Sequence, residues 1–318
     1  MGCYGIFDRQ GSIVLEWQAM RRLGLFLGWA VLGGVAQSQM QGQTRPAITG
    51  IAFARMYAAD GVASEKFYKG LGYVPEAVGG TTRYPVSDVQ WLEVMPLPAP
   101  TPRSRLAAVG LMTRDAAGME RYLRAKGVPI DEPLRDGRFG VRDPEGNQIV
   151  FVQAGSQRLN VVRKQDPAAS ARIIHAGFAV KSAAAEDAFY HEVLGFKPYW
   201  HGGQTESRTD WVSLQVPEGS DWLEYMLNMP ADANARQRGV MDHFSLGVNH
   251  MDYAVTALAR TGCEGANCMK TQMGRDGKVQ LNVFDPDLTR VEYMEFKASG
   301  VTCCSPITGK VPGVTEER

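Results

Sequence analysis

The sequence predicts an α+β protein made of two similar domains in tandem, each with two βαβββ modules. The first observation is an internal repeat, in which residues 67–73, 91–95 and 142–151 correspond to residues 189–196, 222–226 and 284–293. The second is the order of patterns in each copy: a strand, a helix that ends near a Leu-Gly pair, further strands, a second helix, and strands that close on an Asp-Pro turn. Two homologous domains therefore follow each other.

The repeat also sets the expected boundaries. The first domain covers residues 48–156, with its second helix at 115–126, and the second domain covers residues 172–298, with its second helix at 251–261. Residues 157–171 between them are polar, contain proline and lack apolar periodicity, which is typical of a linker. Residues 299–318 form a tail after the last strand.

The composition favours a small-molecule partner. The chain has 318 residues, 44% of them apolar and 21% charged, and a formal net charge of zero. Such a balance lacks the basic footprint of proteins that bind nucleic acids or anionic membranes. We therefore expect a soluble two-domain protein with a small-molecule substrate and without a nucleic-acid partner.

The first 40 residues indicate export. Arg21 and Arg22 precede an uncharged apolar run at 23–35 and the small residues Ala36 and Ser38, so residues 20–38 are expected to be a signal peptide. Residues 1–19 contain acidic side chains and are interpreted as a mis-assigned upstream segment. The apolar run is short for a membrane span, so the mature protein is expected in the periplasm or outside the cell, free of the membrane. The paired arginines leave a twin-arginine export route open.

Export would place the cysteines in an oxidising compartment, where disulfides persist. Cys263 and Cys268 lie in a predicted loop, and Cys303 and Cys304 lie in the tail. A bond between adjacent cysteines is expected to be strained, so the sequence favours cross-links that pin the tail to the loop. Free thiols and a small metal site remain alternatives.

Four residues of the second domain are candidate metal ligands: His175, Glu224, His243 and Glu292. Each lies in a separate predicted strand, where alternation of side chains can turn it toward one face of a curved sheet. Buried carboxylates are costly unless they are paired or metal-bound. Two imidazoles and two carboxylates suit a borderline divalent ion.

At these residues the chain resembles the vicinal oxygen chelate superfamily, which includes glyoxalases, bleomycin-resistance proteins and extradiol dioxygenases. The resemblance covers about residues 48–298, and the second domain is similar to a bacterial-type glyoxalase I. It implies that each pair of modules forms a cup-shaped mixed sheet. It also implies one divalent ion (Ni, Zn, Mn, Co or Fe) that chelates adjacent substrate oxygens and stabilises an enediolate-like intermediate.

The first domain serves as an internal comparison. Alignment of the repeat places Gly50, Leu106 and Val150 opposite His175, His243 and Glu292, while Glu93 matches Glu224. One carboxylate does not hold a catalytic ion tightly, so the first domain is expected to be metal-free. The site then needs all four ligands within the second domain, in a monomer with paired domains or in a homodimer with exchanged second domains.

The reaction class stays open between three possibilities. The resemblance to glyoxalase I implies a lyase or isomerase in which Glu292 or Glu224 moves the proton, with Asn228 as a substrate-binding residue. Ala179 stands where that family has an arginine for glutathione, so another substrate is expected. An Fe(II) extradiol-type dioxygenase would need only His175, His243 and Glu292. A non-enzymatic binding or resistance protein is the third possibility.

Overall fold

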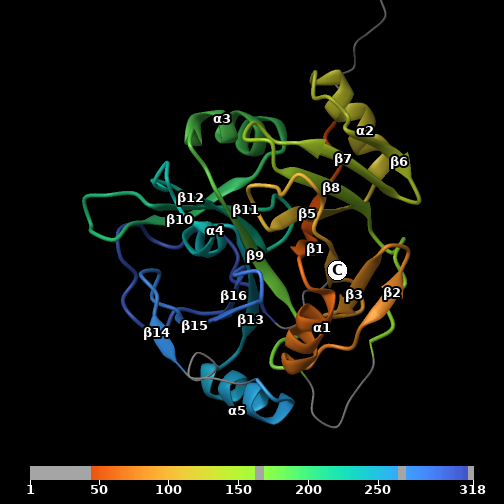
Figure 1. The fold of residues 1–318 in the computed structure, drawn as a ribbon. Helices are drawn as coiled ribbons and strands as arrows, with labels where there is room; N and C mark the ends of the chain where they lie inside the picture. The colour runs from red at the N-terminus through yellow and green to blue at the C-terminus, as the bar shows by residue number, and fades with distance from the viewer. Residues whose placement is uncertain (1–43, 162–167, 264–269, 314–318) are drawn as a thin grey trace, which may run out of the picture. The chain divides into compact units, whose positions relative to one another are not determined.

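The computed structural model describes residues 44–161, 168–263 and 270–313, which belong to one compact unit, Gly42–Arg318. The strands of this unit form two curled eight-stranded sheets with the same plan (Figure 1). The predicted α+β class and the tandem arrangement are therefore confirmed. The expected signal peptide and the segment before it lie outside the described residues.

The first sheet has the strand order β2-β3-β4-β1-β5-β8-β7-β6. Strand β1 pairs parallel with β4 and antiparallel with β5, so the two modules meet along β1 and β5. The strands are β1 (Ile48–Ala58), β2 (Glu76–Val78), β3 (Thr81–Pro85), β4 (Trp91–Pro96), β5 (Leu106–Thr113), β6 (Glu132–Arg135), β7 (Arg138–Arg142) and β8 (Gln148–Gln153).

The second sheet repeats this plan in the order β10-β11-β12-β9-β13-β16-β15-β14. Its central strand β9 pairs parallel with β12 and antiparallel with β13. The strands are β9 (Ile173–Ala179), β10 (Lys197–Gly202), β11 (Trp211–Gln215), β12 (Trp222–Met226), β13 (His243–Val248), β14 (Thr271–Met273), β15 (Val279–Phe284) and β16 (Arg290–Glu295).

The helices begin where a side chain can cap the free amide groups of the first turn. Asp60, Asp115, Ser182 and Asn234 provide such caps. The helices are α1 (Gly61–Gly70), α2 (Ala116–Ala125), α3 (Ala183–Asp187) with the π-helical turn η1 (Ala188–Val193), α4 (Ala235–Met241) and α5 (Met251–Thr261). The sequence predicted helices near all of these positions except α4, which lies between the two modules of the second sheet.

The repeated motifs contact each other between the two halves of the chain. Tyr68 of α1 donates a hydrogen bond to Asp285 in the second Asp-Pro turn (3.2 Å). Tyr190 of η1 donates to Asp143 in the first Asp-Pro turn (3.0 Å). Side chains of both halves also share one large apolar core, which covers the outer sides of the sheets. The Phe-Tyr and Asp-Pro motifs therefore join the two halves reciprocally.

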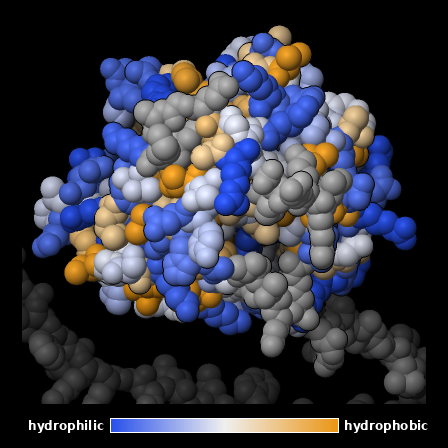
Figure 2. Space-filling model, turned by 90° about the horizontal axis from the view of Figure 1, so that it is seen from below, coloured by the Kyte–Doolittle hydropathy of each residue, from blue (hydrophilic) through white to orange (hydrophobic). Residues whose placement is uncertain are grey.

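The surface carries few large exposed apolar side chains. Val62, Tyr253 and Val301 are among the most exposed of them in the described part of the chain. On the face seen in Figure 2, hydrophilic and hydrophobic residues are interspersed. Within the described residues no helix is long and apolar enough to cross a membrane.

Candidate metal centre

Three of the four candidate ligands meet at one point of the second sheet. The Nε2 atom of His175 lies 3.1 Å from Nε2 of His243 and 3.0 Å from Oε2 of Glu292. The Nε2 atom of His243 lies 3.9 Å from the same Glu292 oxygen. All three side chains are buried. Three donor atoms thus converge as they would around a single cation.

Strand pairing explains this convergence. Ser245 of β13 is paired on one side with His175 of β9 and on the other with Glu292 of β16. His243 precedes Ser245 by two residues, so it projects from the same face of β13. Its ring lies over Gly177, where an added Cβ atom would be 2.7 Å from Nδ1 of His243. Gly177 therefore leaves the space that the imidazole occupies.

The surroundings of the two imidazoles orient them. Nδ1 of His243 donates its hydrogen to the carbonyl oxygen of Met241 (2.9 Å), which leaves the Nε2 lone pair free toward the cluster. The ring of His175 stacks on Trp222 at 4.7 Å. Burial, together with Arg290 and His175, lowers the pKa of His243 well below its usual value. His243 is therefore neutral and suited to bind a metal ion.

Glu292 is charged at physiological pH. Burial alone would raise its pKa, but Arg290 and the two histidines outweigh burial and lower the pKa to about 2. Arg290 lies two residues earlier on β16, and its Nη1 atom is 3.7 Å from Oε1 of Glu292. The other carboxylate oxygen, Oε2, remains on the side of the histidines.

Glu224 stands beside this cluster. Its Oε2 atom is 3.6 Å from Nε2 of His243, and its Oε1 atom accepts a hydrogen bond from Ser213 (3.3 Å). Burial raises the pKa of Glu224 above the usual value for a glutamate, and Glu292 adds to the shift. The structure thus brings all four candidates together, with three donor atoms as the compact group and Glu224 at its edge.

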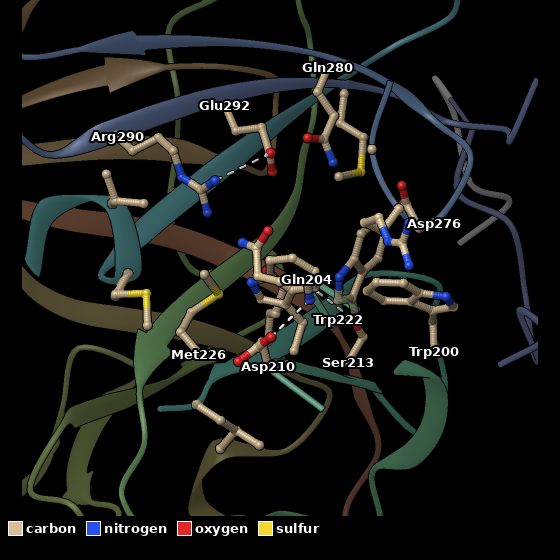
Figure 3. A pocket seen from close by; sticks show the side chains of 18 of the residues that line it. Trp200, Gln204, Asp210, Ser213, Trp222, Met226, Asp276, Gln280, Arg290 and Glu292 are labelled. Atoms are coloured by element: carbon tan, nitrogen blue, oxygen red, sulfur yellow. Dashed lines mark hydrogen bonds and ion pairs between the residues drawn. The ribbon is translucent and has the colours of Figure 1, made fainter. Parts of the chain in front are cut away.

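A cavity of about 590 Å³ opens over the two carboxylates. Glu292 and Arg290 project into it from one wall, while Trp200 and Trp222 lie across the cavity (Figure 3). Asp276 and Lys278, which is almost fully buried, form an ion pair nearby (3.6 Å), and the Lys278 ammonium lies 4.3 Å from the Trp222 ring centre. The two carboxylates, Glu224 and Glu292, are therefore reachable by a small molecule.

The donor set fits a divalent ion. One Nε2 lone pair is held toward the cluster, a second imidazole faces it at 3.1 Å, and a charged carboxylate completes the group. Two imidazoles and one carboxylate with open positions are a common set for Fe(II), and imidazole also suits Zn, Ni and Co.

The first sheet has different residues at the corresponding positions, and the sequence alignment of two of them was wrong. By strand pairing, Phe53 corresponds to His175, because each pairs with the tryptophan of the next strand, Trp91 or Trp222. Ala108 corresponds to His243, since the two pair with Arg55 and Gly177 at matching positions. Gly50 and Leu106 lie three and two residues before these positions.

Val150 does correspond to Glu292, and Glu93 corresponds to Glu224, as the repeat predicted. Glu93 is fully buried and is paired with three arginines. Arg55 lies 2.7 Å, Arg138 3.2 Å and Arg83 3.6 Å from its carboxylate oxygens. The first sheet thus holds an internal ion-pair cluster where the second holds the candidate metal centre.

Asn228 also lines the cavity, but its side-chain amide forms hydrogen bonds within the protein. Its backbone φ is 60°, and Nδ2 donates to the carbonyl oxygen of Thr209 (2.9 Å) and to Asp210 (2.8 Å). A role in substrate binding stays a prediction. Sequence analysis missed Arg290, Ser213 and Trp222, although the spacing of two between Arg290 and Glu292 places both on one strand face.

The expected disulfide arrangement was wrong for the tail. Cys303 and Cys304 are bonded to each other. The tail is attached to β10, where Ser305 accepts from the backbone of His201 and Thr308 bonds to the backbone of Tyr199, so the two thiols lie on a different element from the end of α5. Cys263, after α5, is also disulfide-bonded, and Cys268 lies outside the described residues.

Fold and site together define a protein with a buried His/His/Glu cluster at the floor of a curled β-sheet. Residues 172–293 match the family model described as the Glyoxalase/Bleomycin resistance protein/Dioxygenase superfamily. Residues 172–293 are therefore similar to domains of this superfamily, the vicinal oxygen chelate group. No curated protein matches the chain.

Three solved structures share the fold of both halves. Homoprotocatechuate 2,3-dioxygenase from Arthrobacter globiformis has a TM-score of 0.61 at 16% identity, covering 83% of this chain and 84% of that chain. The enzyme from Brevibacterium fuscum, in complex with 3,4-dihydroxyphenylacetate, has a TM-score of 0.59 at 16% identity, with 79% and 82% covered. The 2,3-dioxygenase LapB from Pseudomonas sp. KL28 has a TM-score of 0.58 at 16% identity, with 81% and 94% covered.

Proposed function

We propose that this protein is a divalent-metal-dependent enzyme of the lyase or isomerase type, acting on a small substrate with two adjacent oxygen atoms. The observation that carries the proposal is the position of Glu224, a carboxyl group 3.6 Å from a candidate ligand and open to the cavity. A site that only held an ion would not need a further carboxyl group with a raised pKa at its edge.

In this proposal His175, His243 and Glu292 hold the ion. A bound divalent ion would act as a Lewis acid on the two substrate oxygens and make a neighbouring C–H bond more acidic. Glu224 would accept the proton from carbon and return it, as a positioned carboxyl group does in general acid-base catalysis. Ser213 would orient Glu224 through the hydrogen bond to Oε1.

A second candidate is an extradiol-type dioxygenase that uses Fe(II). The set of two histidines and one glutamate favours it, as does the likeness to the three dioxygenases over both halves of the chain. In this case Glu224 would exchange protons with a catechol hydroxyl group rather than with carbon. Binding without chemistry is the remaining alternative.

We also propose that the protein is exported. The observations that support this are the bond between Cys303 and Cys304 and the oxidised state of Cys263, because disulfides persist outside the reducing cytosol. The apolar pattern of residues 20–38 would then direct export.

The test uses the purified full chain loaded with Ni, Zn, Mn, Co or Fe(II). Hydroxyacetone in D₂O probes proton transfer at carbon by NMR, and catechol with an oxygen electrode probes ring cleavage. We expect metal-dependent exchange that Glu224→Gln lowers by roughly 10²- to 10⁴-fold, the usual contribution of general base catalysis, while metal content is unchanged. Oxygen uptake with catechol and Fe(II) would instead favour the dioxygenase, and absence of both reactions would favour a binding protein.

A further inference from the structure

Arg290 has bonding capacity that the protein itself does not use. Its side chain is 12% exposed, and its Nε atom is buried without a hydrogen-bond partner among the described residues. Among the described residues its one ion pair is with Oε1 of Glu292, at 3.7 Å, which is too long for a good hydrogen bond. A buried donor without an acceptor is costly, so the protein leaves this guanidinium only partly compensated.

The charges around the cavity leave a positive excess, which includes the exposed Arg275 and the nearly buried Arg290. A divalent ion would be balanced by Glu224 and Glu292, because histidines bind metals as neutral ligands. Asp276 and Lys278 balance each other in their own pair (3.6 Å). Arg290 would then be an almost buried positive charge beside a neutralised centre, and an anionic ligand would supply the missing charge.

The geometry places this anion next to the centre rather than at the far end of the cavity. Glu292 turns Oε2 toward the histidines and Oε1 toward Arg290, so the guanidinium and the centre lie on either side of one carboxylate. Figure 3 shows the Arg290 guanidinium reaching into the cavity from the same wall as Glu292. A ligand that contacts both must carry its anionic group within a bond or two of its chelating oxygens.

We propose that the substrate is a 2-hydroxy or 2-oxo carboxylate and that Arg290 binds its carboxylate. One carboxylate oxygen and the adjacent hydroxyl or keto oxygen would face the centre, and the other carboxylate oxygen would accept a hydrogen bond from the Arg290 guanidinium where it reaches into the cavity. This inference rests on the proposed function, since it names the substrate class of the same cavity. Arg290 is then a substrate-binding residue. The planar guanidinium of an arginine matches the geometry of a carboxylate better than the ammonium group of a lysine does.

Lactate and lactamide form a matched pair of probes, because they share the hydroxyl and carbonyl oxygens and differ in charge. Their binding to the cobalt-loaded protein is followed by the visible absorption of Co(II), and the metal content is measured in parallel. We expect wild type to bind lactate more tightly than lactamide. Arg290→Met should lower the affinity for lactate about 10- to 100-fold, because a charge-assisted hydrogen bond is lost. The affinity for lactamide and the metal content should stay unchanged.

Two further variants complete the test. Arg290→Lys keeps the positive charge and should lower the affinity for lactate less than Arg290→Met does. Arg208→Met removes another arginine that lines the cavity, but one that is half exposed and paired with Asp210, and should leave lactate binding unchanged. The inference would be overturned if Arg290→Met lowered the affinities for lactate and lactamide equally. It would also be overturned if both Arg290 variants lost the metal. Absence of metal from wild type would instead overturn the proposed function.

Discussion

Phe53 occupies in the first sheet the position that His175 occupies in the second. Each residue pairs with the tryptophan at the start of the next parallel strand and with a small residue of the antiparallel neighbour, Gly110 or Ser245. The aromatic ring of Phe53 fills the space over Gly110, where an added Cβ atom would lie 2.9 Å from its Cγ atom. The two sheets therefore share one backbone plan, and side chains alone decide which of them can hold an ion.

Glu93→Gln should leave the metal content unchanged and destabilise the protein. Burial alone would raise the pKa of Glu93, but Arg55 and Arg138 outweigh it and lower the pKa, so the carboxylate is charged among three arginines. Removal of the Glu93 charge leaves those arginines without a counter-charge. Such a loss in a buried ion pair lowers the free energy of unfolding by about 3 kcal/mol. Urea denaturation and elemental analysis measure the two effects, and loss of the ion would show that the first sheet takes part in binding.

Gly177→Ala should weaken metal binding without unfolding the protein. The new methyl group would displace the ring of His243. When the orientation of a metal ligand is disturbed, the affinity for the metal typically falls about 10- to 100-fold. Gly61→Ala is the matched control, because an added Cβ meets no atom within 4 Å there and the residue begins a helix. Affinity is measured by competition with a coloured chelator. Equal affinities of the two variants would contradict the assigned position of His243.

Glu186→Gln should make stability less dependent on pH. Burial and the nearby Asp143 raise the pKa of Glu186 to about 8, and its Oε2 atom has no hydrogen-bond partner among the described residues. The folded protein thus keeps a proton that the unfolded chain releases above a pKa of about 4.3. Stability of the wild type is therefore expected to fall as pH rises from 5 to 8, by on the order of 4 kcal/mol.

Denaturation at several pH values checks this expectation. The Glu186→Gln variant should lose less stability than the wild type over the same interval, while Glu192→Gln, at an exposed position of η1, should behave like the wild type. A parallel decline of all three proteins would show that Glu186 is ionised in the folded state.

The repeated motifs allowed much of this architecture to be predicted. The alternation of side chains along each strand placed Glu224 and Glu292 on the concave face of the sheet. The Leu-Gly and Asp-Pro motifs marked the ends of helices and the turns within each domain. The positions assigned to Gly50 and Leu106 were wrong, because strand pairing places Phe53 and Ala108 there. A fixed spacing from the Phe-Tyr motif would have found Phe53, since Phe53 precedes Phe67, and His175 precedes Phe189, by the same fourteen positions.

Other features depended on contacts between distant segments. The tail lies along β10, where Ser305 accepts a hydrogen bond from the backbone of His201, and local sequence does not encode this contact. The unused Nε of Arg290 became evident only when its neighbours were known. The four ligand candidates were found because each lay on a strand rich in apolar residues, where a charged or imidazole side chain has a reason to be present.

The most direct test of the account is the metal content of the purified protein and of His243→Ala, measured by elemental analysis. The account predicts about one divalent ion per chain in the wild type, as two imidazoles and a carboxylate provide for a single centre, and little or none in the variant. A wild-type protein without stoichiometric metal, or a His243→Ala protein that retains it, would contradict the metal centre.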